Sequence, residues 1–134
     1  MKYKEVKRHY ESGQIECHYF VDENGDRHGE YRSYHWNGSL RWHYFLVNQW
    51  RCGEVKDFYY DGTLCDHYLT DSNDNDLATV IQYGEESTHS EEELIEMAKE
   101  HGVPLLSELP KTEAELTHWN LKWPECPCLP ISTE

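Results

Sequence analysis

One phrase occurs three times in the first half of the chain, and this repeat limits what the sequence can fold into. The copies read KEVKRHYESGQI, GEYRSYHWNGSL and GEVKDFYYDGTL, and their turn glycines, Gly13, Gly38 and Gly62, are offset by 25 and 24 residues. A second phrase, HYF, HYF and HYL, follows with the same offsets, beginning at His18, His43 and His67. A repeat of this length is one supersecondary unit, which must stack on its neighbours to bury its apolar face.

Each repeat is predicted to be a β-hairpin. Both phrases are about six residues of alternating character, rich in Tyr and β-branched residues, and each first phrase closes with SG, NG or DG. An Asn or Asp before Gly tolerates the positive φ that a tight turn demands. We therefore expect six antiparallel strands over about residues 3–70, without helix between residues 4 and 69. Alternation places one residue of each second phrase in a buried row: Phe20, Phe45 and Leu69.

The repeated phrase resembles a known family. An aromatic pair, Asn-Gly or Asp-Gly, one residue and an aliphatic residue, with GE opening the next unit, resembles the MORN-variant hairpin repeat of bacterial and phage proteins. The resemblance covers residues 4–70, and the first copy departs from it by having Lys4 where the others have Gly29 and Gly53. It implies a scaffold that binds partners, often with an antitoxin-like label, and it implies no catalytic residue.

The chain changes character after residue 70. The polar run TDSNDND predicts a boundary between a repeat sheet (1–70) and an acidic appendage (71–134). Within the appendage, LATVIQY predicts a further strand over 77–83. Capping boxes predict two short helices, about 91–101 and 113–123, before a tail rich in Pro and Cys. The fold class is then α+β, with the buried row covered by helix residues: Leu94, Ile95, Leu116 and Trp119.

Charge and aromatic residues divide between the two halves. Residues 1–70 contain 15 of the 18 aromatic residues and 9 Lys and Arg against 11 Asp and Glu. Residues 71–134 contain 3 basic and 15 acidic residues, so most of the net charge of −14 lies there. An acidic field repels nucleic acid and anionic lipid and favours a basic protein partner. Because MKYKEV leads directly into an expected strand and no run is apolar enough to span a membrane, we expect a cytoplasmic protein.

Two groups of residues are predicted to contact the partner. Trp36 and Tyr60 occupy equivalent positions beside turn residues, and Trp50 lies at another turn. Large aromatic residues at turns are poorly explained by core packing and are typical of binding hot spots. The acidic half supplies carboxylates that would attract a basic surface, namely Glu85, Glu86, Glu92 and Glu96.

The sequence gives little support for catalysis or for a cofactor. His18, His43 and His67 fall on alternate strands, ~10 Å apart at ~4.8 Å per strand, which is too far for one zinc ion with ligands at ~2.0 to 2.3 Å. They are interpreted as half-buried sheet residues. Cys126 and Cys128 form a weak candidate metal pair, which Cys52, Cys65 or a histidine would complete. The odd number of cysteines predicts reduced thiols. No nucleotide-binding or nucleophile motif is present, so we expect no enzyme and no cofactor.

Three functions are compatible with these features. The leading hypothesis is a non-enzymatic binder or inhibitor that caps a basic protein surface, as a phage counter-defence or antitoxin-like factor would. A narrower alternative is a nucleic-acid mimic whose carboxylates block a nuclease or DNA-binding enzyme. The other alternative is a small metal-binding domain that uses the tail cysteines. Direct binding of nucleic acid is not expected.

Overall fold

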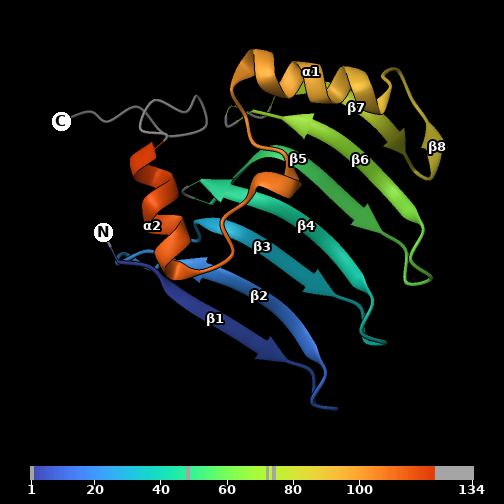
Figure 1. Ribbon diagram of the computed structural model, residues 1–134. Helices are drawn as coiled ribbons and strands as arrows, with labels where there is room; N and C mark the ends of the chain where they lie inside the picture. Colours follow the sequence, from blue (N-terminus) through green and yellow to red (C-terminus); the bar gives the residue numbers. More distant parts are fainter. Residues whose placement is uncertain (1, 48, 72, 74, 123–134) are drawn as a thin grey trace.

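The computed structural model describes residues 2–47, 49–71, 73 and 75–122. It contains one antiparallel sheet of eight strands in sequential order, with two helices on one of its faces (Figure 1). The fold is therefore an α+β hairpin meander, as predicted. The short last strand was not predicted. The strands are β1 (Lys4–His9), β2 (Ile15–Val21), β3 (Gly29–Tyr34), β4 (Leu40–Val47), β5 (Trp50–Phe58), β6 (Leu64–Thr70), β7 (Asp76–Gln82) and β8 (Glu85–Glu86).

The helices form where the capping signals occur. In α1 (Glu91–His101), the Glu93 amide donates to Ser90 Oγ (3.1 Å) and the Ser90 amide donates to Glu93 Oε1 (2.9 Å). A 3₁₀ turn, η1 (Leu106–Glu108), leads to α2 (Glu113–Lys122), whose Glu115 amide donates to Thr112 Oγ1 (3.0 Å). No helix in the described part of the chain is long and apolar enough to cross a membrane.

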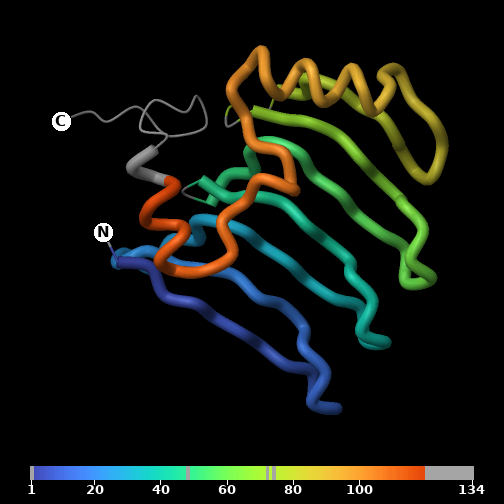
Figure 2. Tube along the Cα trace, viewed as in Figure 1, coloured from blue at the N-terminus to red at the C-terminus, as the bar shows by residue number. Residues whose placement is uncertain are grey.

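The helices and the sheet share one apolar core. The predicted row of Phe20, Phe45 and Leu69 is at most 1% exposed, and it packs in one cluster with Leu94, Leu116 and Trp119 of the helices, which confirms that prediction. Ile95 is the exception, since it is only half-buried and lies outside this cluster. α1 lies on β6 and β7, and the chain then crosses the same face through η1 to α2 (Figures 1 and 2).

The three predicted turns differ in detail from the expectation. The glycines take positive φ, at +93°, +90° and +93° for Gly13, Gly38 and Gly62. The residues before them do not, so the role expected of Asn37 and Asp61 is wrong. Their carboxamide and carboxylate oxygens instead accept backbone N–H groups two residues on, from Ser39 (3.1 Å) and Thr63 (3.0 Å). Asn37 and Asp61 thus stabilise their turns through these local hydrogen bonds, and only the glycine that follows each of them takes positive φ.

The same irregularity occurs in the three hairpins that these turns close. The strand register shifts between Arg8 and His9, between Ser33 and Tyr34, and between Asp57 and Phe58. Each shift leaves one extra residue on the second strand, namely Glu16, Arg41 and Cys65. A β-bulge bends its strand and increases the local twist, so these hairpins bend at corresponding positions. All the regular structure described between residues 4 and 69 is strand, in agreement with the sequence.

Candidate functional site

Four exposed aromatic side chains lie along one end of the sheet, where successive hairpins turn. Trp36 in the β3–β4 turn is 73% exposed, and Tyr59 and Tyr60 in the β5–β6 turn are 43% and 63% exposed. Tyr83, between β7 and β8, is 76% exposed. These turns follow one another along one end of the strands (Figure 2). We call these four residues the turn edge.

Hydrogen bonds join neighbouring turns of this edge. His35 Nε2 donates to the Phe58 carbonyl (2.8 Å), and Asn37 Nδ2 donates to the Tyr60 carbonyl (3.0 Å). Ser39 Oγ donates to the same Tyr60 oxygen (3.0 Å). The backbone that carries Trp36 is thereby fixed to the backbone that carries Tyr60. A surface ordered before binding loses less conformational entropy when a partner docks.

The structure brings together some of the predicted partner-binding residues and separates others. Trp36 and Tyr60 belong to the turn edge, and the exposed Glu85 and Glu86 follow Tyr83 on β8. Glu92 and Glu96 are exposed on α1, which begins shortly after β8. Trp50 is 61% exposed, but it lies at the β4–β5 turn, at the opposite end of β4 from Trp36. The eight residues of β4 separate the two ends by roughly 27 Å at ~3.4 Å per residue.

Two residues of the turn edge were not predicted from the sequence. Tyr59 precedes Tyr60 in YYDG, and only Tyr60 was predicted, because it is equivalent to Trp36 in the repeat. Tyr83 has a φ of +52°, an uncommon backbone conformation for a bulky residue. Its amide donates to Asp66 Oδ1 (3.2 Å), and the following Gly84 amide donates to the Cys65 carbonyl (2.8 Å). An aromatic residue shortly before a glycine occurs in YG as in WNG and YDG, and this signal could have located Tyr83.

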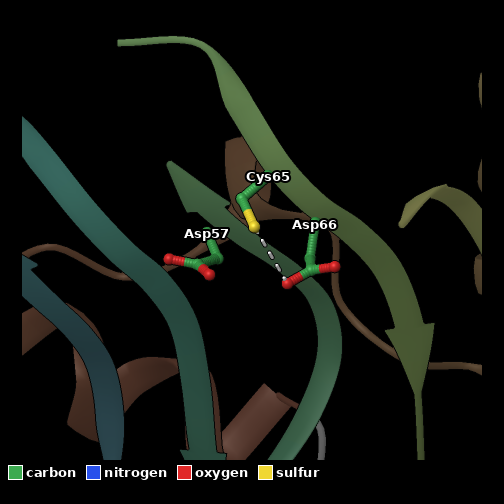
Figure 3. A group of neighbouring side chains, drawn as sticks. All are labelled: Asp57, Cys65 and Asp66. Carbon is green, nitrogen blue, oxygen red and sulfur yellow. Dashed lines mark hydrogen bonds between the residues drawn. The ribbon is translucent and has the colours of Figure 1, made fainter. Parts of the chain in front are cut away.

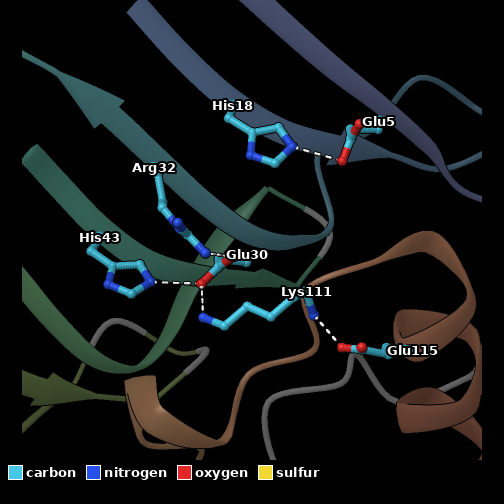
Figure 4. A network of polar contacts seen from close by, with 7 residues as sticks. All are labelled: Glu5, His18, Glu30, Arg32, His43, Lys111 and Glu115. Carbon is cyan, nitrogen blue, oxygen red and sulfur yellow. Dashed lines mark hydrogen bonds and ion pairs between the residues drawn. The ribbon is translucent and has the colours of Figure 1, made fainter. Parts of the chain in front are cut away.

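The sheet histidines each pair with a glutamate thirteen residues earlier. The distances from His Nε2 to the carboxylate are 2.9 Å for Glu5 and His18, 2.7 Å for Glu30 and His43, and 2.6 Å for Glu54 and His67. The contact between Glu5 and His18 meets the distance of an ion pair, but its geometry does not make a hydrogen bond. The Glu5 and Glu30 pairs are drawn in Figure 4. These pairs account for the histidines as sheet residues, because each ring has a carboxylate partner.

Glu30 connects the sheet to the segment between the helices. Its carboxylate accepts hydrogen bonds from His43, from Arg32 (2.9 Å) and from the Lys111 ammonium (Figure 4). Burial would raise the pKa of Glu30, but the three hydrogen bonds outweigh it and lower the pKa to about 2. Glu54 is similar, since it accepts from His67 and from the Leu106 amide (2.9 Å). Both carboxylates therefore hold the segment after α1 against the sheet.

Asp57, Cys65 and Asp66 are the one group of three potential metal ligands among the described residues. Their ligand atoms lie within 4.8 Å of one another, on β5 and β6 (Figure 3). Two carboxylates and a thiol are donors that zinc accepts, so this group could hold a divalent ion. The predicted pair Cys126 and Cys128 lies outside the described residues.

Asp57 and Asp66 face each other directly across β5 and β6, and like charges in such positions are destabilising. Burial and the charge of Asp66 raise the pKa of Asp57, so ionisation of Asp57 reduces stability as pH rises above 3.8. Asp57→Asn should therefore raise the free energy of unfolding at pH 7 by up to about 1 kcal/mol, measured by urea denaturation. The gain should vanish below pH 3.8.

The control is Asp61→Asn, which removes the same charge from an exposed turn. Its amide oxygen can still accept from Thr63, so the change in stability should be within about 0.5 kcal/mol. A loss of stability in Asp57→Asn at pH 7 would contradict the expected repulsion.

The cysteines differ in state. Cys17 and Cys65 carry free thiols. Cys52 is fully buried and disulfide-bonded, so the prediction of a reduced thiol is wrong for this residue.

Comparisons with protein-family models, with curated proteins and with solved structures found no match to this chain.

Proposed function

We propose that the chain is a non-enzymatic binding module or inhibitor that caps a basic surface of a protein partner with its turn edge. The edge supports this proposal because it holds four exposed aromatic side chains on hydrogen-bonded turns. Trp36, Tyr60 and Tyr83 are 73%, 63% and 76% exposed, so core packing does not account for them, whereas Trp and Tyr dominate the energetics of protein interfaces. Apolar patches of this kind on a monomer mark interaction sites.

The charge of the surroundings supports a basic partner. Glu85 and Glu86 follow the turn edge directly, and Glu92 and Glu96 lie on the helix that comes next in the chain. The whole chain has a net charge of −14. Such a field accelerates association with a cationic surface and repels the phosphates of nucleic acid. In this proposal the carboxylates attract the partner, and the aromatic rings set the lifetime of the complex.

The regular hairpins support a repeat origin for this surface. Three bulges at corresponding positions and three Glu–His pairs with one spacing follow the sequence repeat. We therefore propose a hairpin-repeat protein of the MORN-variant type, in which the repeat sheet presents the turns and the acidic segment covers one face. In this proposal the chain acts as an antitoxin-like or phage counter-defence factor, a role that a small acidic scaffold suits.

Charge neutralisation tests the electrostatic part of the proposal. The partner is first captured from a lysate of the source cell and identified. Replacing Glu85, Glu86, Glu92 and Glu96 together by Gln should then lower its association rate constant about tenfold at low salt, with a smaller effect near physiological salt, where screening acts within ~8 Å. Surface plasmon resonance at several salt concentrations measures this. A matched control replaces four exposed carboxylates around β1, β2 and the start of α2, namely Glu5, Glu11, Glu23 and Glu113, by Gln.

An association rate that is indifferent to salt and to these glutamates would contradict charge steering. A captured nuclease or DNA-binding enzyme that DNA displaces from the complex would instead identify the chain as a nucleic-acid mimic.

A further inference from the structure

A cavity of about 270 Å³ opens on the face of the sheet that the helices leave uncovered. It lies among β2, β3 and β4, and its aromatic walls include Tyr31, Trp42 and Tyr44. Cys17, Ser33 and Glu16 supply polar groups to the lining. Tyr34, which also lines it, is two residues before Trp36, so the cavity lies just inside the turn edge. Its volume suits a single side chain better than a drug-sized ligand.

The Ser33 hydroxyl in this cavity has no hydrogen-bond partner. Ser33 is 9% exposed, and its Oγ is buried without a donor or acceptor in reach. A buried polar group without a partner is costly, and such groups in native proteins call for an explanation. A polar group that enters the cavity would satisfy this hydroxyl. A hydroxyl can both donate and accept, so Ser33 favours an occupant with a polar group, and the aromatic walls decide which kind of polar group it is.

The same face already binds two guanidinium groups of the chain itself. Arg27 lies over the rings of Tyr19 (4.9 Å) and Tyr31 (5.8 Å), and Arg51 lies over those of Trp42 and Tyr44 (both 4.7 Å). Tyr31 and Tyr44 are themselves stacked at 4.9 Å. Guanidinium groups prefer the faces of Trp and Tyr rings, where the ring quadrupole is negative. Both internal arginines thus demonstrate the chemistry that these aromatic walls select.

We propose that this cavity receives an arginine side chain of the protein partner. The proposal rests on the proposed function, and it names the anchor that the basic partner inserts beside the turn edge. The guanidinium group donates to Ser33 Oγ, packs against Tyr34 and Trp42, and is balanced by the Glu16 carboxylate. Tyr31 and Tyr44 already stack on each other and lie under Arg27 and Arg51. Five N–H donors on a flat cation can serve all three contacts, which the compact ammonium of lysine cannot.

Arg41 also lines the cavity, and its charge opposes a further cation, as do the charges of Arg27 and Arg51 over the aromatic walls. Arg41 also interacts electrostatically with the Asp57 carboxylate, whose pKa it acts to lower, so part of its charge is balanced within the chain. Asp57 lies directly across the strand pair from Trp42, so a carboxylate remains beside the cavity. An anion bound by Arg41 is the competing occupant, and the test includes it.

The test is an NMR titration of the full chain with N-acetyl-arginine amide. The amide of Ser33 and the indole N–H of Trp42 should shift saturably, with a dissociation constant of roughly millimolar size, as suits one side chain. The neutral isostere N-acetyl-citrulline amide should bind at least about threefold more weakly. Ser33→Ala and Glu16→Gln should each weaken the arginine probe about threefold, whereas Glu11→Gln, in an exposed turn outside the cavity, should not.

Three results would overturn the inference: no saturable shift, equal binding of the two probes, or stronger binding of N-acetyl-glycinate, an anion. Trp50→Ala, which changes an exposed ring at the opposite end of β4, should leave binding of the arginine probe unchanged. A captured partner that needs the turn edge but is indifferent to Ser33→Ala and Glu16→Gln would remove the arginine anchor and leave the proposed function intact.

Discussion

Replacing Glu54 by Ala should lower the free energy of unfolding by about 3 to 5 kcal/mol. The substitution leaves the buried His67 ring, whose side chain is 3% exposed, without its carboxylate at 2.6 Å. It also removes the acceptor of the Leu106 amide, which is buried at the point where η1 meets β5. Each donor left without a partner in the interior costs about 1 to 3 kcal/mol. Urea denaturation at pH 7 measures the loss.

Glu5→Ala is the matched control, because Glu5 makes the corresponding contact to His18. Its carboxylate is 39% exposed, and an exposed ion pair contributes below about 1 kcal/mol. Burial would raise the pKa of Glu54, but the bonds from His67 and Leu106 lower it, so its stabilisation is complete above pH 4.5 and is lost as pH falls through the lowered pKa. The gap between wild type and Glu54→Ala should therefore shrink below pH 4.5. Equal losses in the two variants would contradict the assigned role of Glu54.

Replacing Gly53 by Ala should be at least ~2 kcal/mol more destabilising than Gly62→Ala. Both glycines have nearly the same positive φ, +95° and +93°, so both substitutions carry the same backbone strain. A Cβ on Gly53 would lie 2.3 Å from the Pro104 carbonyl oxygen, which is backbone that cannot rotate away. That oxygen also accepts the Glu54 amide (3.0 Å). At Gly62 nothing lies within 4 Å of the added Cβ.

The backbone strain alone should cost about 1 to 2 kcal/mol in Gly62→Ala. Thermal or urea unfolding of both variants gives the difference between their free energies of unfolding. If Gly53→Ala does not fold while Gly62→Ala does, the prediction is also confirmed. Two variants of equal stability would contradict the close packing of the segment after α1 on β5.

Much of the fold follows from local signals in the sequence. Alternation in the repeated phrases predicts the strands and the buried row of Phe20, Phe45 and Leu69, because strand side chains point to opposite faces with a period of two. The capping box of Ser90 and Glu93 predicts where α1 begins. In the structure the two side chains accept hydrogen bonds from each other's backbone amides, which have no partner within the helix. The misplacement of Ile95 is also understandable, because a helical stripe indicates a face only to within one or two positions.

The candidate site was harder to predict, because its parts meet through the meander. Trp36 and Trp50 look alike in the sequence, yet β4 carries them to opposite ends of the sheet. Glu30, Glu54 and Lys111 look like surface charges, and only tertiary contacts reveal that both glutamates are buried. The cavity beside Ser33 depends on residues from three strands, β2, β3 and β4, which local patterns do not bring together.

Partner binding by the turn edge is tested most directly by the dissociation rate of the captured partner from three proteins. These are the wild type, the double variant Trp36→Ala/Tyr60→Ala and the single variant Trp50→Ala. We predict that the double variant dissociates at least about 30-fold faster, the effect of losing roughly 2 kcal/mol of hot-spot contact. Trp50→Ala, which removes an equally exposed ring at the opposite end of the sheet, should stay within about twofold of wild type. Equal rates for all three proteins, or a larger effect of Trp50→Ala, would contradict binding through the turn edge.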